Sequence, residues 1–400
     1  MTFNVPAQYH RAVVANIAFW RERVLGVGPS ADQWHSQHKA IWQAVAAGLS
    51  CHPVQAETVA FAVELMPLLE RWGVWTEWLA LLETAETIEL TPMLKVRLLL
   101  AKCRLYVLNR NFGDAVHDLE MALSLAANNR LMDLAALAHF GLVNAYLGDK
   151  KHTLALSHGL KALELLSPAQ ITRRAALYNS LGLIELERQA FAASEKRFQQ
   201  ALALWYEVDE PTQLARTYLN LGVVYQQQQR WEEAKRCYEQ ARTALAPTAS
   251  LVDKLKVLNG LGALHYMTQS LSEAEAAFRE GVTTANQLQG MYHLRGSLTH
   301  NLGNTLLALG RWVESRLSLE KSVRLWQQAN DGLEQANSLG TLGELFEAQG
   351  EWGLAASRYE EALQLLNDYP MHPWAQKLRV EFEPAQARCA AAAQSATTSS

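Results

Sequence analysis

The sequence predicts an all-α fold in which about eight helical hairpins stack into a solenoid between N-terminal and C-terminal capping helices. Alanine, leucine, glutamine and glutamate dominate the 400 residues and proline is scarce at 11, a composition that favours helix. A Leu-Gly pair also recurs in steps of 40, 40, 41 and 40 residues, at Leu181, Leu221, Leu261, Leu302 and Leu342. Self-similarity at a fixed period of this size is typical of a repeat protein.

The same pattern of apolar and small residues, which we call the frame, follows each Leu-Gly pair. A large apolar residue stands nine positions after the glycine, a small residue twelve after, an aromatic residue or leucine sixteen after and a small residue nineteen after. In the unit of Leu221 these residues are Trp231, Ala234, Tyr238 and Ala241. Apolar residues three or four positions apart form one face of a helix, so the frame describes two helices joined by a turn. One hairpin cannot bury its apolar face alone, so the hairpins must stack.

Weaker matches extend the frame toward the N-terminus, and together they predict a repeat array over residues 54–367. Residues 1–53 are expected to form two amphipathic helices, about 7–25 and 32–49, which either cap the first hairpin or dock an effector. Residues 368–389 are expected to form a capping helix with a break at Glu383-Pro384, because the last repeat would otherwise expose its apolar face. The Ala-, Ser- and Thr-rich residues 390–400 are expected to be disordered.

The frame resembles the tetratricopeptide repeat over about three quarters of the chain. Usual units of that family have 34 residues, whereas HEAT and armadillo units have about 40–47. The 20-residue spacing from Leu221 to Ala241 is that of the tetratricopeptide family, so the additional residues lie between the hairpins, and HEAT units would not show this frame. Long units of this kind are similar to those of Pins-type adaptors, kinesin light chains, and bacterial STAND and Rap-type sensor arrays. The resemblance implies a right-handed superhelical solenoid that binds peptides or proteins.

Composition and motifs argue against several other classes of protein. The formal net charge is −4 at pH 7, which lacks the basic excess of a nucleic-acid-binding protein. No apolar run approaches the ~18 residues of a membrane helix, and residues 13–20 are wrongly flanked for a signal peptide, so a cytoplasmic protein is expected. The four cysteines lie far apart, which argues against a disulfide framework or a zinc module.

The sequence offers no catalytic constellation. It has no P-loop, G-x-S-x-G or H-E-x-x-H motif, so neither an enzyme nor a cofactor is expected. His35 and His38 could share one helix face, but no third ligand is near them in the sequence, so no metal site is predicted. Trp72, Trp75 and Trp78 cluster in the first unit and could leave one ring exposed for a partner.

The resemblance places a partner on the concave surface, which is lined by the first helix of each hairpin. Counting from each Leu-Gly pair gives the candidate groove residues Asn179, Arg216, Asn220, Lys256, Asn259, Asn301, Asn304, Asn337 and Glu344. An asparagine amide offers donors and an acceptor, so it can bind a peptide backbone of any sequence. Arg216 and Lys256 could hold an acidic side chain or a C-terminal carboxylate. In the alternative interpretation, the asparagines cap or bridge helices within the solenoid.

Two functions are compatible with this pattern. The first is a non-enzymatic scaffold or adaptor that binds a peptide segment or partner protein in the concave groove. The second is a ligand- or peptide-responsive sensor that controls a docked effector, because small rotations between adjacent repeats add up along a solenoid. Both predict a protein or peptide partner rather than nucleic acid or a membrane, and both allow the chain to be a subunit of a larger complex.

Overall fold

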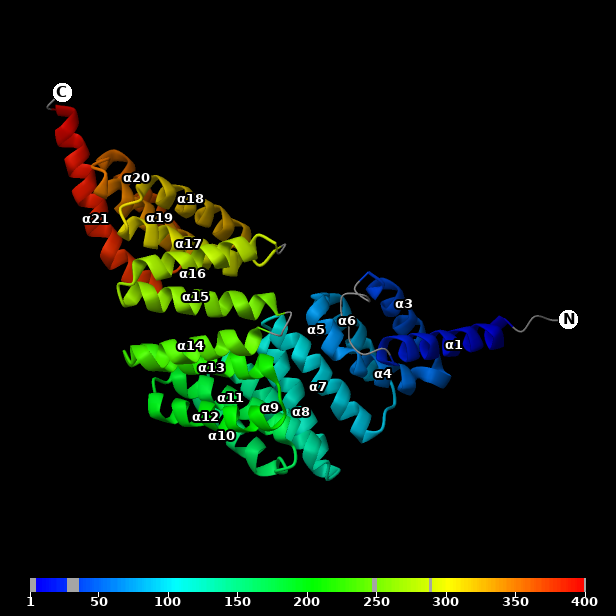
Figure 1. The fold of residues 1–400 in the computed structure, drawn as a ribbon. Helices are drawn as coiled ribbons and strands as arrows, with labels where there is room; N and C mark the ends of the chain where they lie inside the picture. Colours follow the sequence, from blue (N-terminus) through cyan, green and yellow to red (C-terminus); the bar gives the residue numbers. More distant parts are fainter. Residues whose placement is uncertain (1–4, 27–35, 247–249, 288–289, 399–400) are drawn as a thin grey trace. The chain divides into compact units, whose positions relative to one another are not determined.

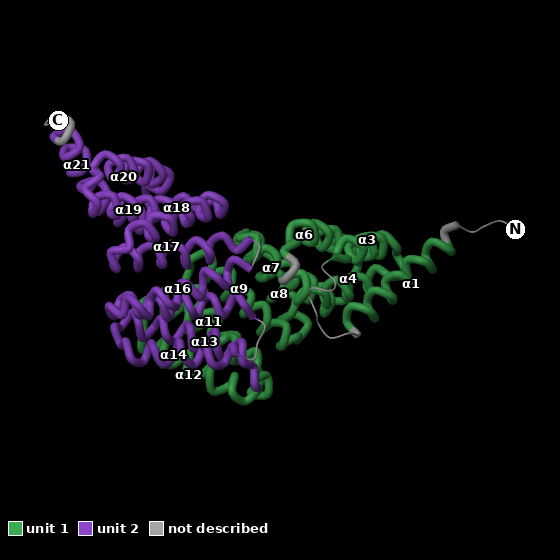
Figure 2. The backbone as a smooth tube through the Cα atoms, turned by 45° about the horizontal axis from the view of Figure 1, so that its top comes forward, with its two compact units in different colours: residues 1–208 green, residues 209–400 purple. Residues whose placement is uncertain are grey.

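A computed structural model describes residues 5–26, 36–246, 250–287 and 290–398, and every regular element in these ranges is a helix (Figure 1). The predicted all-α class is therefore confirmed for this part of the chain. The chain divides into two compact units, Met1–Val208 (unit 1) and Asp209–Ser400 (unit 2), shown in Figure 2. No helix in the described ranges is long and apolar enough to cross a membrane.

Unit 1 begins with helices of unequal length and continues with three regular hairpins within its described residues. The irregular part comprises α1 (Val5–Gly26), α3 (His38–Leu49), α4 (Gln55–Glu64), α5 (Met66–Trp72) and α6 (Trp75–Thr84), with short 3-10 turns at His52–Val54 and Ala85–Thr87. The hairpins are α7 (Pro92–Leu108) with α8 (Phe112–Asn128), α9 (Met132–Gly148) with α10 (His152–Leu165), and α11 (Ile171–Glu187) with α12 (Phe191–Glu207).

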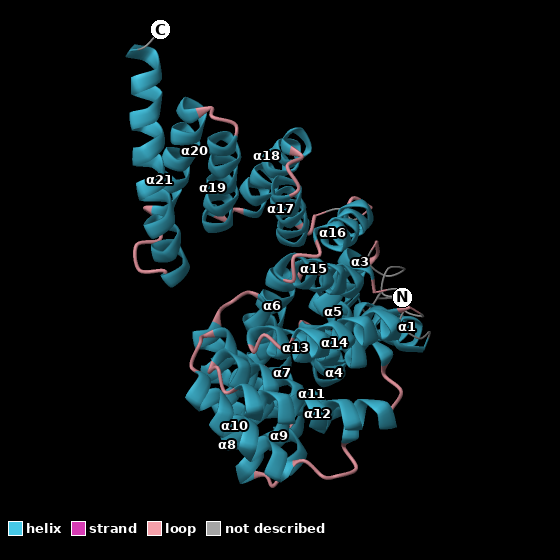
Figure 3. Ribbon diagram, turned by 60° about the vertical axis from the view of Figure 1, so that its left-hand side comes forward, coloured by secondary structure: helices cyan, strands magenta, loops and turns pink. Residues whose placement is uncertain are grey.

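Unit 2 contains four hairpins and a long final helix among its described residues (Figure 3). The hairpins are α13 (Pro211–Gln227) with α14 (Trp231–Leu245), α15 (Leu251–Met267) with α16 (Leu271–Ala285), α17 (Tyr292–Ala308) with α18 (Trp312–Ala329), and α19 (Gly332–Ala348) with α20 (Trp352–Leu366). The final helix α21 (Pro373–Thr398) packs against α20 and α19. Its buried residues Leu378, Phe382 and Cys389 belong to the same apolar cluster as the last hairpin.

The glycine of each Leu-Gly pair sets how closely the two helices of a hairpin approach. A Cβ atom on Gly222 would lie 2.5 Å from the ring of Tyr238, which stands sixteen positions later in the frame. The same contact would be 2.6 Å between Gly182 and the ring of Phe198. Because the aromatic ring occupies the space that a side chain would need, only glycine allows this approach. The regular recurrence of the glycine therefore has a packing cause.

Residues 55–84 depart from the regular hairpin that the sequence predicts as the first unit. Pro67 stands in the first turn of α5 and separates it from α4, since proline is tolerated at a helix start but not in its interior. Gly73 then ends α5 with φ at +72°. Trp78 is buried and the indole N–H of Trp75 donates to the carbonyl of Glu70, whereas the side chain of Trp72 lies outside the described residues.

The C-terminal helix also differs from the sequence-based expectation. The prediction of a break at Pro384 is wrong, because α21 continues through that residue to Thr398. Residues 390–398, expected to be disordered, are part of this helix. Ala385 and Cys389 lie buried beyond the proline, so packing against unit 2 offsets the backbone hydrogen bond that proline cannot make. The alanine-rich sequence that follows has high helix propensity.

In the hairpin of α7 and α8, a lysine takes the position that leucine holds in the later repeats. Lys102 is 2% exposed, and its ammonium donates to a carboxylate oxygen of Asp118 at 2.8 Å and contacts Glu86. A buried ammonium without a partner would be strongly destabilising, so these carboxylates are what allow a lysine at this core position.

We expect Gly222→Ala to lower the free energy of unfolding by about 1–3 kcal/mol, because the new methyl group overpacks the contact with Tyr238. Gly353→Ala in α20 is the matched control, since a Cβ there meets no atom within 4 Å. Urea unfolding followed by circular dichroism measures both variants. Equal stability of the two variants would show that the glycine contact does not constrain the hairpin.

We expect Asp118→Ala to destabilise the protein by about 3 kcal/mol, because the buried Lys102 ammonium loses one of its two carboxylate partners. The double variant Lys102→Leu with Asp118→Ala should recover most of this loss, since it removes the buried charge and restores the leucine of the later repeats. Thermal melting of both variants against the parent tests this. A double variant no more stable than Asp118→Ala would contradict it.

Candidate partner-binding surface

The first helices of the four hairpins form one layer of unit 2. Helices α13, α15, α17 and α19 pack on one another in consecutive pairs. Each second helix packs instead against its own first helix and against the first helix that follows. We call the four helices the first-helix layer of unit 2. Eight of the nine predicted groove residues lie on this layer, and the ninth, half-buried Asn179, lies on α11 in unit 1.

Arg216 on α13 binds a carboxylate of the next repeat. Its guanidinium donates to both carboxylate oxygens of Asp253 on α15, at 3.0 and 2.9 Å. Ser250 donates to the same carboxylate at 2.5 Å. Burial would raise the pKa of Asp253, but these hydrogen bonds outweigh it and hold the pKa below its ordinary value. Arg216 therefore links two hairpins within unit 2, and the acidic side chain that it holds belongs to this chain.

Lys256 lies one turn after Asp253 on α15 and remains available. It is exposed to solvent and makes no ion pair with any residue that the structure describes. Of the two cations that the sequence singled out for an acidic partner, Arg216 binds the Asp253 carboxylate directly, whereas Lys256 acts on it only through its charge, which helps to lower the pKa of Asp253. A single exposed ammonium can attract an anionic group but does not fix its orientation.

Asparagines from neighbouring repeats pair with each other in the middle of the layer. The amide of Asn301 on α17 donates to the side-chain oxygen of Asn259 on α15 at 2.9 Å. Nearer the C-terminal ends of the same two helices, the hydroxyl of Tyr266 donates to the side-chain oxygen of Asn304 at 3.4 Å. The structure thus brings the predicted asparagines of α15 and α17 together.

A further polar pair joins α17 to α19. The Nδ1 atom of His300 lies 3.0 Å from the hydroxyl of Ser338, which is itself 3.0 Å from the hydroxyl of Ser322 on α18. Burial lowers the pKa of His300 to about 4, so its ring is neutral at pH 7. Sequence reasoning missed His300, Ser338 and Tyr266. Tyr266 and Asn304 are 38 residues apart, as are His300 and Ser338, whereas Ser322 and Ser338 are 16 apart. A search for polar pairs about one repeat apart would have found the first two contacts.

The remaining predicted residues on this layer are Asn220, Asn337 and Glu344. Asn220 is half-buried on α13, and the amide of Asn337 donates to Glu334 on its own helix at 3.3 Å. Glu344 is accessible to solvent, yet its pKa is raised because the surrounding protein desolvates its carboxyl and Glu381 and Glu347 add negative charge. The layer therefore carries an exposed cation on α15 and an acidic group on α19.

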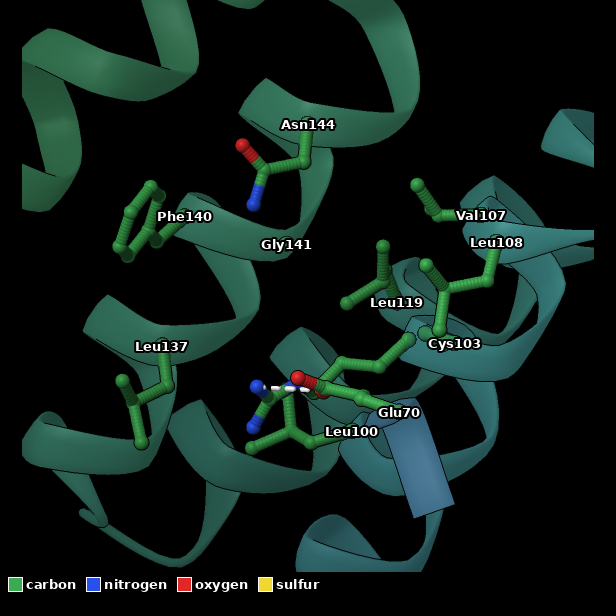
Figure 4. A pocket seen from close by; sticks show the side chains of 11 residues that line it. Glu70, Leu100, Cys103, Val107, Leu108, Leu119, Leu137, Phe140, Gly141 and Asn144 are labelled. Carbon is green, nitrogen blue, oxygen red and sulfur yellow. Dashed lines mark ion pairs between the residues drawn. The ribbon is translucent and has the colours of Figure 1, made fainter. Parts of the chain in front are cut away.

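Unit 1 contains a pocket that sequence reasoning did not anticipate. It lies between α7 and α9, has a volume of about 470 Å³, and is also lined by Leu119 of α8 (Figure 4). Its wall is mainly aliphatic and aromatic, whereas Arg104, Glu70 and Asn144 contribute polar groups. The guanidinium of Arg104 pairs with the carboxylate of Glu70 at 2.5 Å.

The described surfaces differ in chemistry between the two units. In the ranges that the structure covers, no group of three histidine, cysteine, aspartate or glutamate side chains is placed to hold a metal ion. His35, one of the two histidines considered from the sequence, lies outside those ranges. The layer of unit 2 offers amides and an ammonium along four adjacent helices, and unit 1 offers an apolar pocket with a polar edge.

Comparison with solved structures finds the same fold in several bacterial proteins. Aspartyl phosphate phosphatase F from Bacillus subtilis aligns with a TM-score of 0.57 and 12% identity, over 91% of this chain and 94% of that chain. The apo form of the quorum sensor NprR from B. thuringiensis aligns with a TM-score of 0.55 and 12% identity, over 82% and 97%. A Rap protein complexed with competence and sporulation factor aligns with a TM-score of 0.54 and 13% identity, over 84% and 99%.

Comparison with protein families gives the identity of the repeats, whereas a comparison with curated proteins found no match. The tetratricopeptide-repeat model matches residues 172–246, 213–287 and 294–368. These matches cover α11 to α20, so the hairpins of unit 2 are tetratricopeptide repeats with a period near 40 residues. The fold is an all-α solenoid of such hairpins, and the chain contains an array of tetratricopeptide repeats over the matched residues.

Proposed function

We propose that this protein is a non-enzymatic scaffold or adaptor of the cytoplasm, which binds an extended peptide segment or a partner protein on the first-helix layer of unit 2. The observation that carries the proposal is the pair of half-buried amides at Asn259 and Asn301, which lies between two adjacent repeats and beside the exposed ammonium of Lys256. Peptide binding agrees with the match to the tetratricopeptide repeat, a family of protein-interaction repeats.

The amide pair has hydrogen-bonding capacity left for a partner. Each asparagine side chain has two N–H donors and an oxygen that accepts two hydrogen bonds. Within the described residues, the single bond between them is the only hydrogen bond that either side chain makes. The remaining groups are accessible to water, so they cost little when no partner is bound and can exchange water for the N–H and C=O groups of an extended peptide.

Arg216 acts as a positioning residue in this proposal. Its two hydrogen bonds to Asp253 hold α15 against α13, and Lys256 follows Asp253 by one turn on the same helix. The ion pair thereby fixes the helix that carries both Lys256 and Asn259. Asn220, Asn304, Asn337 and Glu344 extend the same surface over the four helices, and Asn179 is the corresponding residue on α11 of unit 1.

A sensor is the second candidate, and the polar pairs between repeats favour it. Links such as Asn259 with Asn301 and His300 with Ser338 join consecutive first helices, so a ligand that competes for these groups would alter how the hairpins pack on one another. The quorum sensor NprR and the Rap protein complexed with competence and sporulation factor share the fold and give this candidate further support.

The adaptor proposal predicts that a triple variant, Lys256→Ala, Asn259→Ala and Asn301→Ala, loses a partner that the parent captures from an extract of its own cells. Removing three hydrogen-bonding groups of about 1 kcal/mol each should weaken binding by about a hundredfold. Quantitative mass spectrometry of captured proteins measures this, and circular dichroism verifies that the variant is folded.

The matched control alters three exposed polar residues on second helices of the same unit, Lys235, Gln240 and Glu280, to alanine. These residues lie on α14 and α16 and are no part of the first-helix layer. The control should retain the partner. If both triple variants capture the same proteins as the parent, the first-helix layer of unit 2 is not the binding surface.

Hydrogen exchange separates the two candidates once a partner is in hand. A sensor should show altered exchange in α1 and α3 when the partner occupies unit 2, because the signal must reach a docking region for an effector. A scaffold should show protection only where the partner lies. Exchange in α1 and α3 that is unchanged at saturating partner would exclude the sensor that acts through residues 1–53.

A further inference from the structure

The pocket of unit 1 is built from two facing first helices. Leu137, Phe140 and Asn144 project from α9, and Leu100 and Val107 project from α7 across from them (Figure 4). Gly141 stands immediately before Leu142, the same register position that Asn301 occupies before Leu302 in unit 2. The pocket therefore occupies in unit 1 the seam that polar side chains bridge in unit 2.

Gly141 allows an apolar side chain to line the base of the seam. A Cβ atom on Gly141 would lie 2.5 Å from a methyl carbon of Leu119, so the leucine fills the space of the missing side chain and forms the pocket floor. Cys103 lines the same pocket, but its thiol donates to the carbonyl of Ala115 at 3.4 Å and is turned to the core. The surface that faces the opening is thus apolar and has no side chain to cover it.

The polar edge of the pocket suits a neutral amide. Arg104 and Glu70 neutralise each other through their ion pair, so the edge carries no net charge. Asn144 is exposed and makes no hydrogen bond among the residues that the structure describes. Its amide can both donate and accept, which is what the backbone of a peptide requires. An anionic head group would instead meet the carboxylate of Glu70.

We propose that this pocket binds a large apolar side chain, such as leucine or phenylalanine, of an extended peptide, while Asn144 bonds the peptide amide beside it. A volume of about 470 Å³ accommodates such a side chain together with its flanking backbone, and it lies within the ~300–1,000 Å³ of ordinary ligand pockets. The inference rests on the proposed function as a peptide-binding protein and adds a sequence-selective subsite to it. In the two proposals, the amides of unit 2 bind peptide backbone groups, whereas this pocket selects an apolar peptide side chain.

Single capped amino acids test the pocket without knowledge of the natural partner. N-acetyl-leucinamide and N-acetyl-phenylalaninamide are the expected ligands, and N-acetyl-lysinamide and octanoate are the competitors of different chemistry. Each is titrated into the full chain carrying ¹³C-labelled leucine methyl groups, with the resonances of Leu119 and Leu137 assigned by mutation. We expect saturable shifts of both residues with the two apolar amides, and at least tenfold weaker binding of the lysine amide and of octanoate.

Gly141→Ala should weaken binding of N-acetyl-leucinamide at least tenfold, because the new methyl group pushes Leu119 into the pocket. The matched control is Gly113→Ala on α8, where a Cβ meets no atom within 4 Å and binding should be unchanged. Should Gly141→Ala fail to fold, Asn144→Ala provides the second variant. It alters an exposed side chain, and loss of one hydrogen bond should weaken binding about fivefold.

Three outcomes would overturn the inference. They are the absence of any shift at Leu119 and Leu137, equal binding of N-acetyl-lysinamide, and preferential binding of octanoate, which would indicate a lipid pocket. None of them bears on the capture experiment, because the triple variant of unit 2 leaves this pocket unaltered. Failure of the pocket and failure of the peptide-binding function are therefore distinguishable.

Discussion

The structure depends first on the contact between the glycine of each Leu-Gly pair and the large side chain sixteen positions later. A Cβ atom at Gly182, Gly222 or Gly262 would lie about 2.5 to 2.6 Å from an aromatic ring of the second helix, so any larger residue would push the two helices of the hairpin apart. Interiors are close-packed, and a contact this short fixes the separation and rotation of the pair. Every later feature, including the alignment of the first helices, follows from this repeated unit.

The alignment of the first helices gives the polar side chains a structural role and, in our proposal, a binding role as well. Arg216, Asn259 and Asn301 hold neighbouring hairpins together through bonds to residues 37 or 42 positions away. The amides nevertheless keep donors and acceptors in reach of solvent, because half-buried side chains at a seam between helices satisfy only part of their capacity. A surface that both holds repeats together and binds a partner couples the packing of the repeats to the state of binding.

Unit 1 shows what happens when the frame changes. Lys102 takes the position of the core leucine and is paired with the carboxylates of Asp118 and Glu86, and Gly141 stands at the register position of Asn301 and lines an apolar pocket. Both substitutions keep the helices in place, because the contacts of the other frame positions remain. The two units therefore present different chemistry, amides and a cation in unit 2 and an apolar pocket in unit 1.

The sequence by itself determined the helical class, the hairpin as repeating unit and the helix faces, because these depend on spacings of three, four and sixteen residues that are read along the chain. It also placed the candidate residues on the first helices, where the structure has them. Only the tertiary structure decided that Arg216 binds Asp253, that Asn301 pairs with Asn259, that Gly141 opens a pocket and that α21 continues through Pro384. The physical reason is that these outcomes depend on how helices pack against one another, which no local periodicity specifies.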